Sequence, residues 1–219
     1  MTTRLVIADD QALVRAGLRK ILEGGADIRV VGEAENGQEA VSITRRLAPD
    51  VVVMDIRMPV MDGIAATRKL TADGSQARIL VLTTFHLDEY VYEALRAGAS
   101  GFLLKDAPPE RLLEAIDVLQ RGDALLDPSV TRTVIDAFAR TPAARHVLPS
   151  KLDQLTERER QVFNLVARGH SNAEIARQFF MSEGTIKTHV AHILSKLGVR
   201  DRIHAVIYAY ESGFIGRSA

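Results

Sequence analysis

The chain has 219 residues and no formal net charge; 47% of its residues are hydrophobic and 26% are charged. This composition is typical of a globular protein, and the length suits one ordinary domain plus a smaller one. The lack of cysteine excludes disulfides, thiolate metal sites and cysteine nucleophiles. No apolar run approaches the ~20 residues of a membrane span, and the N-terminus has no signal-peptide pattern, so we expect a cytoplasmic protein without membrane contacts.

The two parts of the chain differ in charge. Residues 1–125 carry 15 Lys and Arg against 19 Asp and Glu, whereas residues 126–219 carry 13 against 9. An acidic first part favours cation binding, and a basic second part favours contact with a polyanion. The imbalance is small, so the motifs must decide the function.

Five short apolar runs alternate with segments in which apolar residues recur at helical spacing. We expect strands at 4–8, 28–34, 51–54, 78–83 and 101–104, and helices at 13–22, 37–47, 62–71, 88–97 and 109–121. This alternation predicts an α/β fold, a doubly wound five-stranded parallel sheet with helices on both faces. The expected strand order is 2-1-3-4-5, which is flavodoxin-like.

The alternation stops after Gly122. Residues 125–150 include a moderately helical stretch at 129–140, followed by ten residues without an apolar period. We interpret 125–150 as a linker with one helix. The expected domains are therefore 1–124 and a small all-α domain at 151–219.

Three aspartates follow two of the expected strands. Asp9 and Asp10 come after the first strand, and Asp55 ends the third. Ligands of a doubly wound sheet bind beyond the carboxyl ends of its strands, where the strand order reverses, so these carboxylates are expected to meet. They would repel one another unless a hard cation neutralised them, and Mg²⁺ suits such an oxygen-rich site. A clustered aspartate can act as a nucleophile toward a phosphoryl group, although Asp55 taken alone also fits an ordinary capping aspartate.

Two further strand ends carry matching chemistry. Thr83 ends the fourth strand with a hydroxyl, and Lys105 ends the fifth with an ammonium group. Each alone is an ordinary strand-end residue. Together with the aspartates they indicate an edge of the sheet that binds a phosphoryl group.

These strand ends resemble, over residues 4–121, the conserved set of two-component response-regulator receiver domains. The residues that carry the resemblance are Asp9-Asp10, Asp55, Met58-Pro59, Asp62-Gly63, Thr83 and Lys105. The resemblance implies that Asp55 accepts phosphate from a sensor histidine kinase. It also implies that Asp10, Asp55 and the main-chain carbonyl of Arg57 bind Mg²⁺, with Asp9 acting through water.

The same resemblance assigns the remaining residues of the first domain. Thr83 and Lys105 would contact the phosphoryl group, and Phe102 matches an aromatic position that changes rotamer on activation. From the residues alone, Phe102 fits the core equally well. Asp106 follows Lys105 where many receivers have proline, which leaves open whether this peptide bond is cis.

Helix starts are marked clearly in the last part of the chain. Thr156 and Ser171 each precede a glutamate by three residues, which forms a capping box, and Ser182 is a third N-cap. The three helices are expected to end near residues 169, 179 and 197. The short second helix, a tight turn at 180–181 and the longer third helix predict a helix-turn-helix at about 172–191.

The third of these helices has two distinct sides at about 100° per residue. The residues expected to pack inward are Ile186, Val190, Ile193, Leu194 and Leu197. The residues on the opposite side are Gly184, Thr185, Thr188, Ala191, His192 and Ser195, flanked by Lys187 and Lys196. So small an outward face suits the major groove of DNA, although an ordinary amphipathic surface helix has the same pattern.

Residues 150–215 resemble the LuxR-type DNA-binding domain. The matching motifs are Leu155-Thr156-x-Arg158-Glu159, Gly169-x-Ser171-Asn172-x-Glu174-Ile175-Ala176, Ser182-x-x-Thr185-Ile186-Lys187-Thr188-His189-Val190 and Lys196-Leu197-x-Val199-Arg200. The resemblance implies binding to double-stranded DNA, with base contacts from Lys187 and Thr188.

Further contacts follow from this second resemblance. The residues implied to contact phosphates or sugars are Ser182, Thr185, Asn172 and Lys196, and His192 on the outward face is another DNA-binding candidate. The final helix would form a dimer contact through Ile203, Val206, Ile207 and Tyr210. From the residues alone, this apolar stripe fits the core of the domain equally well.

The two halves together resemble a response regulator of the NarL/FixJ type, a phosphorylation-controlled transcription factor and not an enzyme. Its expected partners are a histidine kinase, DNA, a second copy of the chain when phosphorylated, and RNA polymerase. A Mg²⁺-dependent phosphatase is disfavoured because Arg57 stands where a second acid is needed, and a dinucleotide oxidoreductase because no glycine-rich turn follows the first strand. A constitutive DNA-binding protein with the receiver as a dimerisation scaffold remains an alternative.

Overall fold

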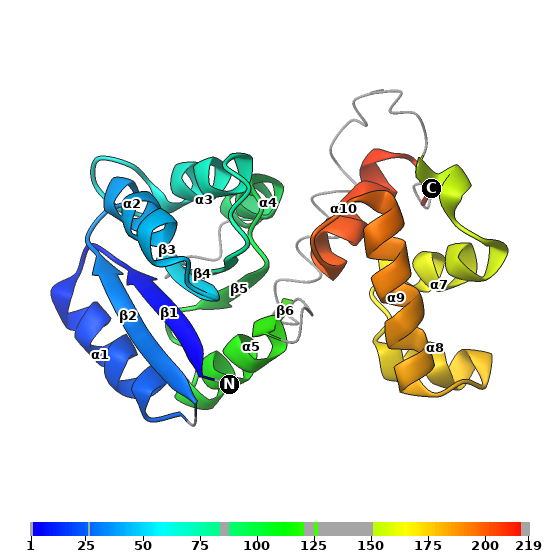
Figure 1. Ribbon diagram of the computed structural model, residues 1–219, viewed down its shortest axis with the longest axis horizontal. Helices are drawn as coiled ribbons and strands as arrows, with labels where there is room; N and C mark the ends of the chain where they lie inside the picture. The colour runs from blue at the N-terminus through cyan, green and yellow to red at the C-terminus, as the bar shows by residue number, and fades with distance from the viewer. Residues whose placement is uncertain (1, 26, 84–87, 121–124, 127–150, 216–219) are drawn as a thin grey trace. The chain divides into compact units, whose positions relative to one another are not determined.

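The computed structural model describes residues 2–25, 27–83, 88–120, 125–126 and 151–215 (Figure 1). The chain divides into two compact units, Met1–Val130 and Thr131–Ala219. The helix expected at 129–140 lies outside the described residues. Within the described ranges, no helix is both long and apolar enough to cross a bilayer.

The first unit is a parallel sheet with helices on both faces. Its strands are β1 (Thr3–Ala8), β2 (Ile28–Ala34), β3 (Val51–Asp55), β4 (Arg78–Thr83), β5 (Gly101–Leu104) and β6 (Leu125–Leu126). Its helices are α1 (Ala12–Glu23), α2 (Gly37–Leu47), α3 (Gly63–Ala72), α4 (Asp88–Ala97) and α5 (Pro109–Gln120). The strand order is β2-β1-β3-β4-β5-β6, which confirms the predicted doubly wound sheet with the order 2-1-3-4-5.

Strand β6 is not predicted from the sequence. Its two residues, Leu125 and Leu126, pair in parallel with Gly101 and Phe102 of β5. A strand of two residues leaves no periodic pattern, so this segment reads as the start of a linker. The sheet therefore continues by one short strand beyond the expected boundary at residue 124.

Strand β3 lies inside the sheet and is buried along its whole length. Helices α1 and α5 pack against each other over one face of the sheet, and α2, α3 and α4 form a continuous layer over the other. A run of three valines suits this position because each side chain meets a covered face. The carboxyl end of β3, at Asp55, is therefore held from both sides by the core.

The described part of the second unit, residues 151–215, is all-helical, as predicted. It consists of the 3₁₀ helix η1 (Lys151–Gln154) and the helices α7 (Glu157–Ala167), α8 (Asn172–Phe179), α9 (Glu183–Leu197) and α10 (Arg202–Glu211). Both predicted capping boxes are present, at Thr156 with Glu159 and at Ser171 with Glu174. The side chain of Ser182 caps α9 by accepting a hydrogen bond from the amide of Thr185.

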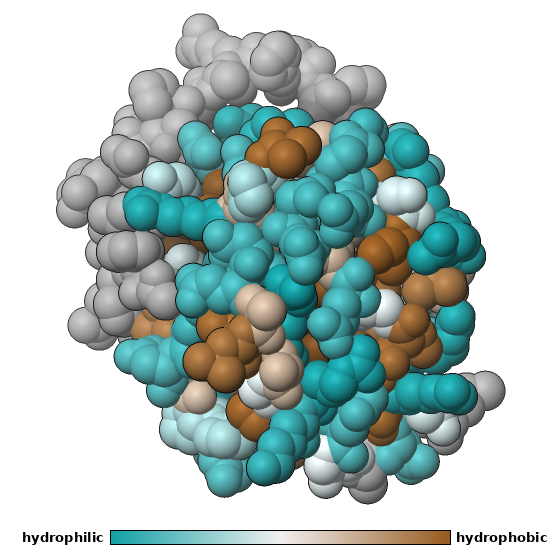
Figure 2. All heavy atoms as spheres, turned by 90° about the vertical axis from the view of Figure 1, so that its left-hand side faces the viewer, coloured by the Kyte–Doolittle hydropathy of each residue, from teal (hydrophilic) through white to brown (hydrophobic). Residues whose placement is uncertain are grey.

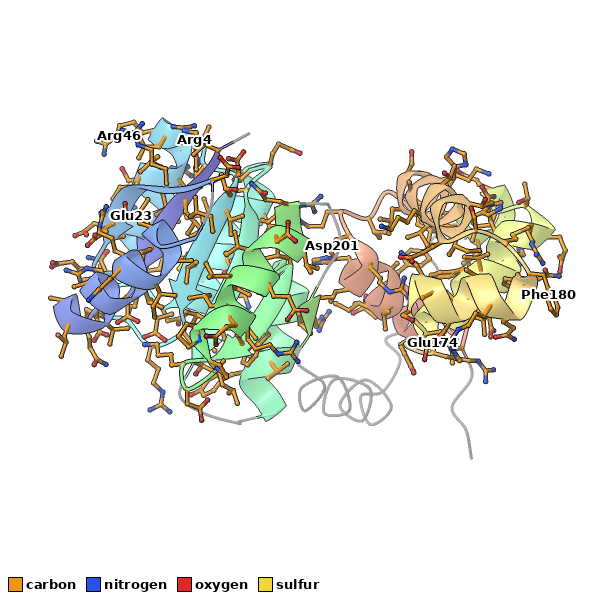
Figure 3. The ribbon with its side chains drawn as sticks, turned by 90° about the horizontal axis from the view of Figure 1, so that it is seen from below. Arg4, Glu23, Arg46, Glu174, Phe180 and Asp201 are labelled. Carbon is orange, nitrogen blue, oxygen red and sulfur yellow. The ribbon has the colours of Figure 1, made fainter. Side chains whose placement is uncertain are left out.

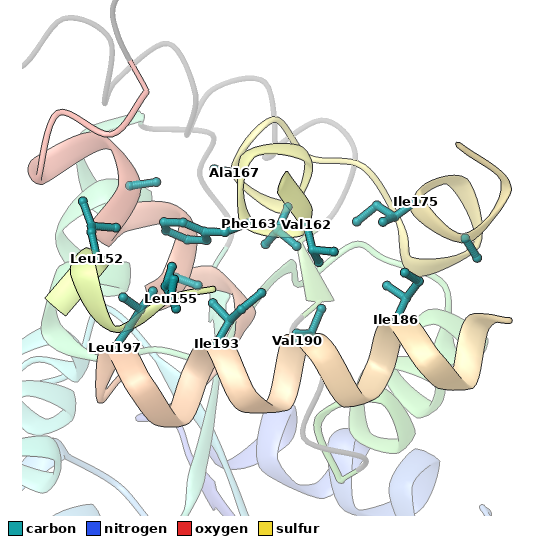
Figure 4. Close-up of a cluster of buried hydrophobic side chains, with 14 residues drawn as sticks. Leu152, Leu155, Val162, Phe163, Ala167, Ile175, Ile186, Val190, Ile193 and Leu197 are labelled. Carbon is teal, nitrogen blue, oxygen red and sulfur yellow. The ribbon is translucent and has the colours of Figure 1, made fainter. Parts of the chain in front are cut away.

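Helix α9 packs along the core of this unit through the side that the sequence predicts (Figure 4). Ile186, Val190, Ile193 and Leu197 are buried against α7 and α8, where Val162, Phe163 and Ile175 meet them. The ring of Phe163 also stacks on that of Phe214, with 4.7 Å between the centroids. The opposite side of α9 is consequently turned away from the core.

Glu159 joins the start of α7 to the end of α9. Its carboxylate accepts hydrogen bonds from the amide of Thr156 at 2.8 Å and from Lys196 Nζ at 2.6 Å. Burial opposes the ionisation of Glu159, but the hydrogen bonds from Lys196 and Thr156 outweigh it and lower its pKa from 4.5 to about 2. Because the pKa is lower in the folded state, ionised Glu159 stabilises the unit above pH 4.5, and this contribution is lost as the pH falls toward 2.

We therefore predict that Glu159→Gln removes part of the acid sensitivity of the second unit. Amide hydrogen exchange of α7 in the wild-type chain should speed up as the pH is lowered from about 5 to about 3, after correction for intrinsic exchange. In Glu159→Gln the corrected exchange should already be fast at pH 5, and it should change less between pH 5 and pH 3 than in the wild-type chain. Equal pH dependence in the two chains would contradict the assigned ion pair.

Candidate functional site

Three carboxylates meet at the carboxyl end of the sheet, as their positions in the sequence predict. Asp9 follows β1 directly, Asp10 comes next, and Asp55 ends β3; one oxygen atom from each lies within 4.8 Å of the others. Asp9 and Asp55 are only 1% and 6% exposed, whereas Asp10 is exposed to solvent. The cluster thus has a buried base and an open side.

Lys105 reaches into this cluster from the end of β5. Its Nζ lies 2.6 Å from Asp9 Oδ2 and 2.8 Å from Asp55 Oδ2. The other oxygen of Asp55 accepts a hydrogen bond from the amide of Ile56 at 2.8 Å. Thr83, at the buried end of β4, is adjacent because its carbonyl accepts a hydrogen bond from the amide of Lys105 at 2.8 Å. The structure therefore brings together the predicted aspartates, Thr83 and Lys105.

Burial raises the pKa of Asp55, and the ion pair with Lys105 offsets only part of this effect. Burial alone would lower the pKa of Lys105, but its bonds to Asp55 and Asp9 outweigh burial, so that pKa is raised. Three ionised carboxylates around one ammonium leave an excess of two negative charges. A divalent cation with a preference for oxygen ligands fits this charge and these donors.

The loop between β3 and α3 is tied closely to Asp55. The amide of Gly63 donates a hydrogen bond to the carbonyl of Ile56 at 2.9 Å, and a Cβ atom at position 63 would lie 1.9 Å from the carbonyl oxygen of Asp55. Only glycine fits here. Asp62 then caps α3 by accepting a hydrogen bond from the amide of Ala65 at 2.7 Å. The loop thus fixes the backbone around Asp55.

Arg57 lies in this loop, with its side chain exposed. Its guanidinium carbon is 5.8 Å from the ring centroid of Tyr90 on α4. A cavity of about 540 Å³ opens beside the carboxylates, and the residues that line it include Asp10, Arg57, Met58, Arg68 and Tyr90. Small reactants have room to approach the open side of the cluster through this cavity.

Sequence reasoning missed Arg15. This buried arginine of α1 donates a hydrogen bond from Nη1 to the carbonyl of Asp9 at 2.8 Å, and its other nitrogens pair with Glu33 and Glu35 at the end of β2. It therefore supports the backbone that carries Asp9. One signal was available in the sequence: Arg15 lies seven residues before Leu22, so the two side chains leave the helix in nearly the same direction. An arginine on the apolar side of α1 indicates a buried polar partner.

Phe102 is fully buried in β5, opposite Val81 in the register with β4. Thr83 lies two residues beyond Val81, so Thr83 and Phe102 face the same side of the sheet.

The Lys105–Asp106 peptide bond, which the sequence leaves open as cis or trans, is trans.

Most of the predicted DNA-binding residues are exposed on one side of α9. These residues are Ser182, Thr185, Lys187, Thr188 and His192. Two others are held within the domain: Lys196 pairs with Glu159, and the side-chain carbonyl of half-buried Asn172 accepts a hydrogen bond from Arg202 at 3.0 Å. Sequence periodicity could not show these contacts because each joins residues about 30 or more positions apart.

Helix α10 packs on the core cluster of the second unit through Ala205 and Ala209, with Val206 and Tyr208 partly buried against that cluster. Ile203 and Ile207 are buried, and Val206 and Tyr210 are half-buried. Among the described residues, Ile203 and Ile207 do not belong to this cluster and lie on the other side of α10 at about 100° per residue, so the dimer stripe stays a prediction.

Both halves of the chain match known families. The family model described as response regulator receiver domain matches residues 5–117, and that of the bacterial regulatory proteins of the luxR family matches residues 153–209. The transcriptional regulatory protein LnrK of Bacillus subtilis is 39% identical over 214 residues, covering 96% of this chain and 97% of its own.

Solved structures agree with these matches. The crystal structure of the response regulator ChrA, from a heme-sensing two-component system, is 38% identical with a TM-score of 0.54, over 98% of this chain and 99% of ChrA. A structure of two RcsB dimers bound to two parallel DNAs is 27% identical with a TM-score of 0.57, over 96% and 99% of the two chains.

The contact between Gly63 and Asp55 can be tested with two glycine variants. Gly63→Ala should destabilise the first unit by ~2 kcal/mol or more, because its methyl group collides with backbone. Gly17→Ala is the matched control, since no atom lies within 4 Å of a Cβ added to this helical residue; it should stabilise the unit by about 0.5–1 kcal/mol. Urea unfolding of the two variants measures both effects, and equal stabilities would contradict the tight packing at Asp55.

Proposed function

The chain belongs to the two-component response regulators, with a receiver domain followed by a LuxR-type DNA-binding domain, and we propose that Asp55 is its phosphoacceptor. The arrangement of Lys105 between Asp9 and Asp55 carries this proposal. A buried carboxylate beside an ammonium group, at the edge of the sheet where a cavity opens next to Asp10, is placed to attack a phosphoryl group and to keep it.

Asp10, Asp55 and the carbonyl of Arg57 would hold Mg²⁺, with Asp9 supporting it through water. The bound ion would neutralise the charge on the phosphoryl oxygens during transfer. The excess of two negative charges among the side chains supports this assignment. We propose this cation because Mg²⁺ prefers oxygen ligands and commonly meets phosphate while keeping some of its waters.

In the proposed transfer, a carboxylate oxygen of Asp55 forms a bond to phosphorus while the bond from phosphorus to the kinase histidine breaks. The imidazole leaves and takes up a proton. The product carries a charge of about −1.5 to −2. Lys105, which pairs with Asp55 before transfer, would then pair with a phosphoryl oxygen, and the Thr83 hydroxyl would donate a hydrogen bond to another.

Two exposed apolar side chains support docking of a protein donor beside this site. Leu13, in the first turn of α1, is 87% exposed, and Val60, in the loop after β3, is 85% exposed. Each lies on one of the segments that carry the carboxylates. The face drawn in Figure 2 is mainly hydrophilic, with separate hydrophobic patches. We propose that Leu13 and Val60 contact the kinase.

The exposed side of α9 is proposed to enter the major groove of DNA, with Lys187 and Thr188 at the bases. Ser182, Thr185 and His192 would lie beside them, and Asn172 and Lys196 at the rim. Phosphorylation would favour a homodimer, whose two domains bind one DNA molecule more tightly than one domain does. The RcsB structure, which contains dimers on DNA, supports this arrangement.

Because β6 extends the sheet, we assign the receiver to residues 1–126, the linker to 127–150 and the DNA-binding domain to 151–219. We also place the chain in the cytoplasm with its DNA. Contact with RNA polymerase is proposed from the same regulatory role. A phosphatase is the competing function at this site. It is disfavoured because an acid is needed two residues after the nucleophile, where the chain has Arg57.

Phosphorylation at Asp55 can be tested with acetyl phosphate and Mg²⁺. The wild type should form one acid-stable, hydroxylamine-labile phosphoprotein band on a phosphate-affinity gel, because acyl phosphates have this lability. Asp55→Asn should form none. Asp50→Asn is a control at the opposite end of β3 and should be phosphorylated normally; equal labelling of all three chains would disprove the assignment.

The groove assignment of α9 can be tested through Lys187. DNA sequences selected from a random pool by the wild type should bind Lys187→Ala about tenfold more weakly, since one base or phosphate contact is lost. Lys20→Ala, an exposed lysine of α1, should bind like the wild type. An unchanged affinity of Lys187→Ala would remove this part of α9 from the interface.

A further inference from the structure

Phe180 combines two features that rarely occur together. It is 98% exposed, and it adopts a left-handed conformation with φ of 54° at the end of α8. A bulky side chain is unfavourable in this conformation. The other left-handed ends among the described residues of this unit use glycine: Gly169 after α7, Gly198 after α9 and Gly213 after α10. The fold thus needs a left-handed residue at position 180, but it does not need an aromatic ring there.

The residues on both sides of Phe180 are fixed within the domain. The guanidinium carbon of Arg158 lies 3.9 Å from the ring centroid of Phe179, and Arg158 Nη2 lies 3.6 Å from Met181 Sδ. Phe179 and Met181 both pack against the core cluster, while Phe180 points away from it at the outer end of α8 (Figure 3). The backbone therefore directs the ring outward before any partner binds. This orientation lowers the entropy cost of binding at this position.

The position of this ring adjoins the surface assigned to DNA. Phe180 stands two residues before Ser182, which caps α9, and five residues before Thr185, which is exposed in the first turn of α9. These groups form the entry end of the helix that is proposed to enter the groove. An exposed aromatic at this end is continuous with that surface.

We propose that Phe180 contacts DNA at the rim of the major groove, where its ring packs against the apolar C–H face of a deoxyribose. The contact chemistry is uncharged, in contrast to that of Lys187. It adds affinity without releasing counterions from the phosphates. This inference rests on the proposed docking of α9 and adds to it a second, apolar anchor.

The test uses the full-length chain and a fluorescent duplex selected by the wild type, with affinities measured by anisotropy over a series of salt concentrations. Phe180→Asn and Phe180→Gly should each bind about three- to tenfold more weakly, while Phe180→Tyr, which keeps the ring, should bind like the wild type. The slope of log K against log salt should stay the same for all four chains, whereas Lys187→Ala should make it shallower.

Thermal unfolding separates this contact from a structural role. Asparagine and glycine accept the left-handed conformation, so both variants should unfold at the same temperature as the wild type or higher, even though they bind DNA less well. A lower unfolding temperature with a proportional loss of affinity would overturn the proposal. Unchanged DNA affinity in both variants would also overturn it, and would indicate that Phe180 contacts a protein partner or a second copy of the chain instead. If the wild type selected no DNA at all, the docking of α9 would fail together with this inference.

Discussion

One ammonium group shared between two buried carboxylates is the interaction on which the receiver domain depends. Lys105 holds Asp9 and Asp55 together, although burial and the nearby charge of Asp9 raise the pKa of Asp55. This arrangement exists because the strand order brings the ends of β1, β3 and β5 to one edge of the sheet. It is incomplete as a charge balance, since Asp10 adds a third carboxylate on the open side. That excess of negative charge supports the proposal that the site binds a cation and then a phosphoryl group.

The residues that hold the backbone at the carboxyl edge of the sheet are as specific as the charged groups there. Arg15 bonds to the carbonyl of Asp9, and Gly63 allows the next loop to approach the carbonyl of Asp55. In the second unit, capping boxes and the Glu159–Lys196 pair fix the helices that present α9. Each unit thus presents a polar surface of its own. Regulation then requires that phosphorylation of the receiver changes how exposed the DNA-binding unit is, or its effective concentration at the DNA. Dimerisation is the simplest way to raise that effective concentration.

The sequence predicted what depends on local pattern and missed what depends on distant pairs. The valines of β3 and the aspartate that ends it showed both the sheet and its reactive edge, and the capping residues showed where the helices of the second unit begin. Arg15 was missed because its role depends on its partners Asp9, Glu33 and Glu35, which lie at the ends of two strands distant in the sequence. The resemblance implies DNA contacts for Asn172 and Lys196, but it gives no sign that Arg202 and Glu159 hold these two side chains within the domain. The conformation of Phe180 has no signal in hydrophobic periodicity, because a left-handed helix end is normally marked by glycine.

The central claim is that phosphorylation of Asp55 controls the affinity of α9 for DNA. The most direct measurement is the dissociation constant of the full-length chain for its selected duplex, with and without acetyl phosphate and Mg²⁺, with the phosphorylated fraction determined in the same sample. The account predicts tighter binding in proportion to that fraction, and no response in Asp55→Asn. An affinity that stays constant while the wild type becomes fully phosphorylated would contradict it.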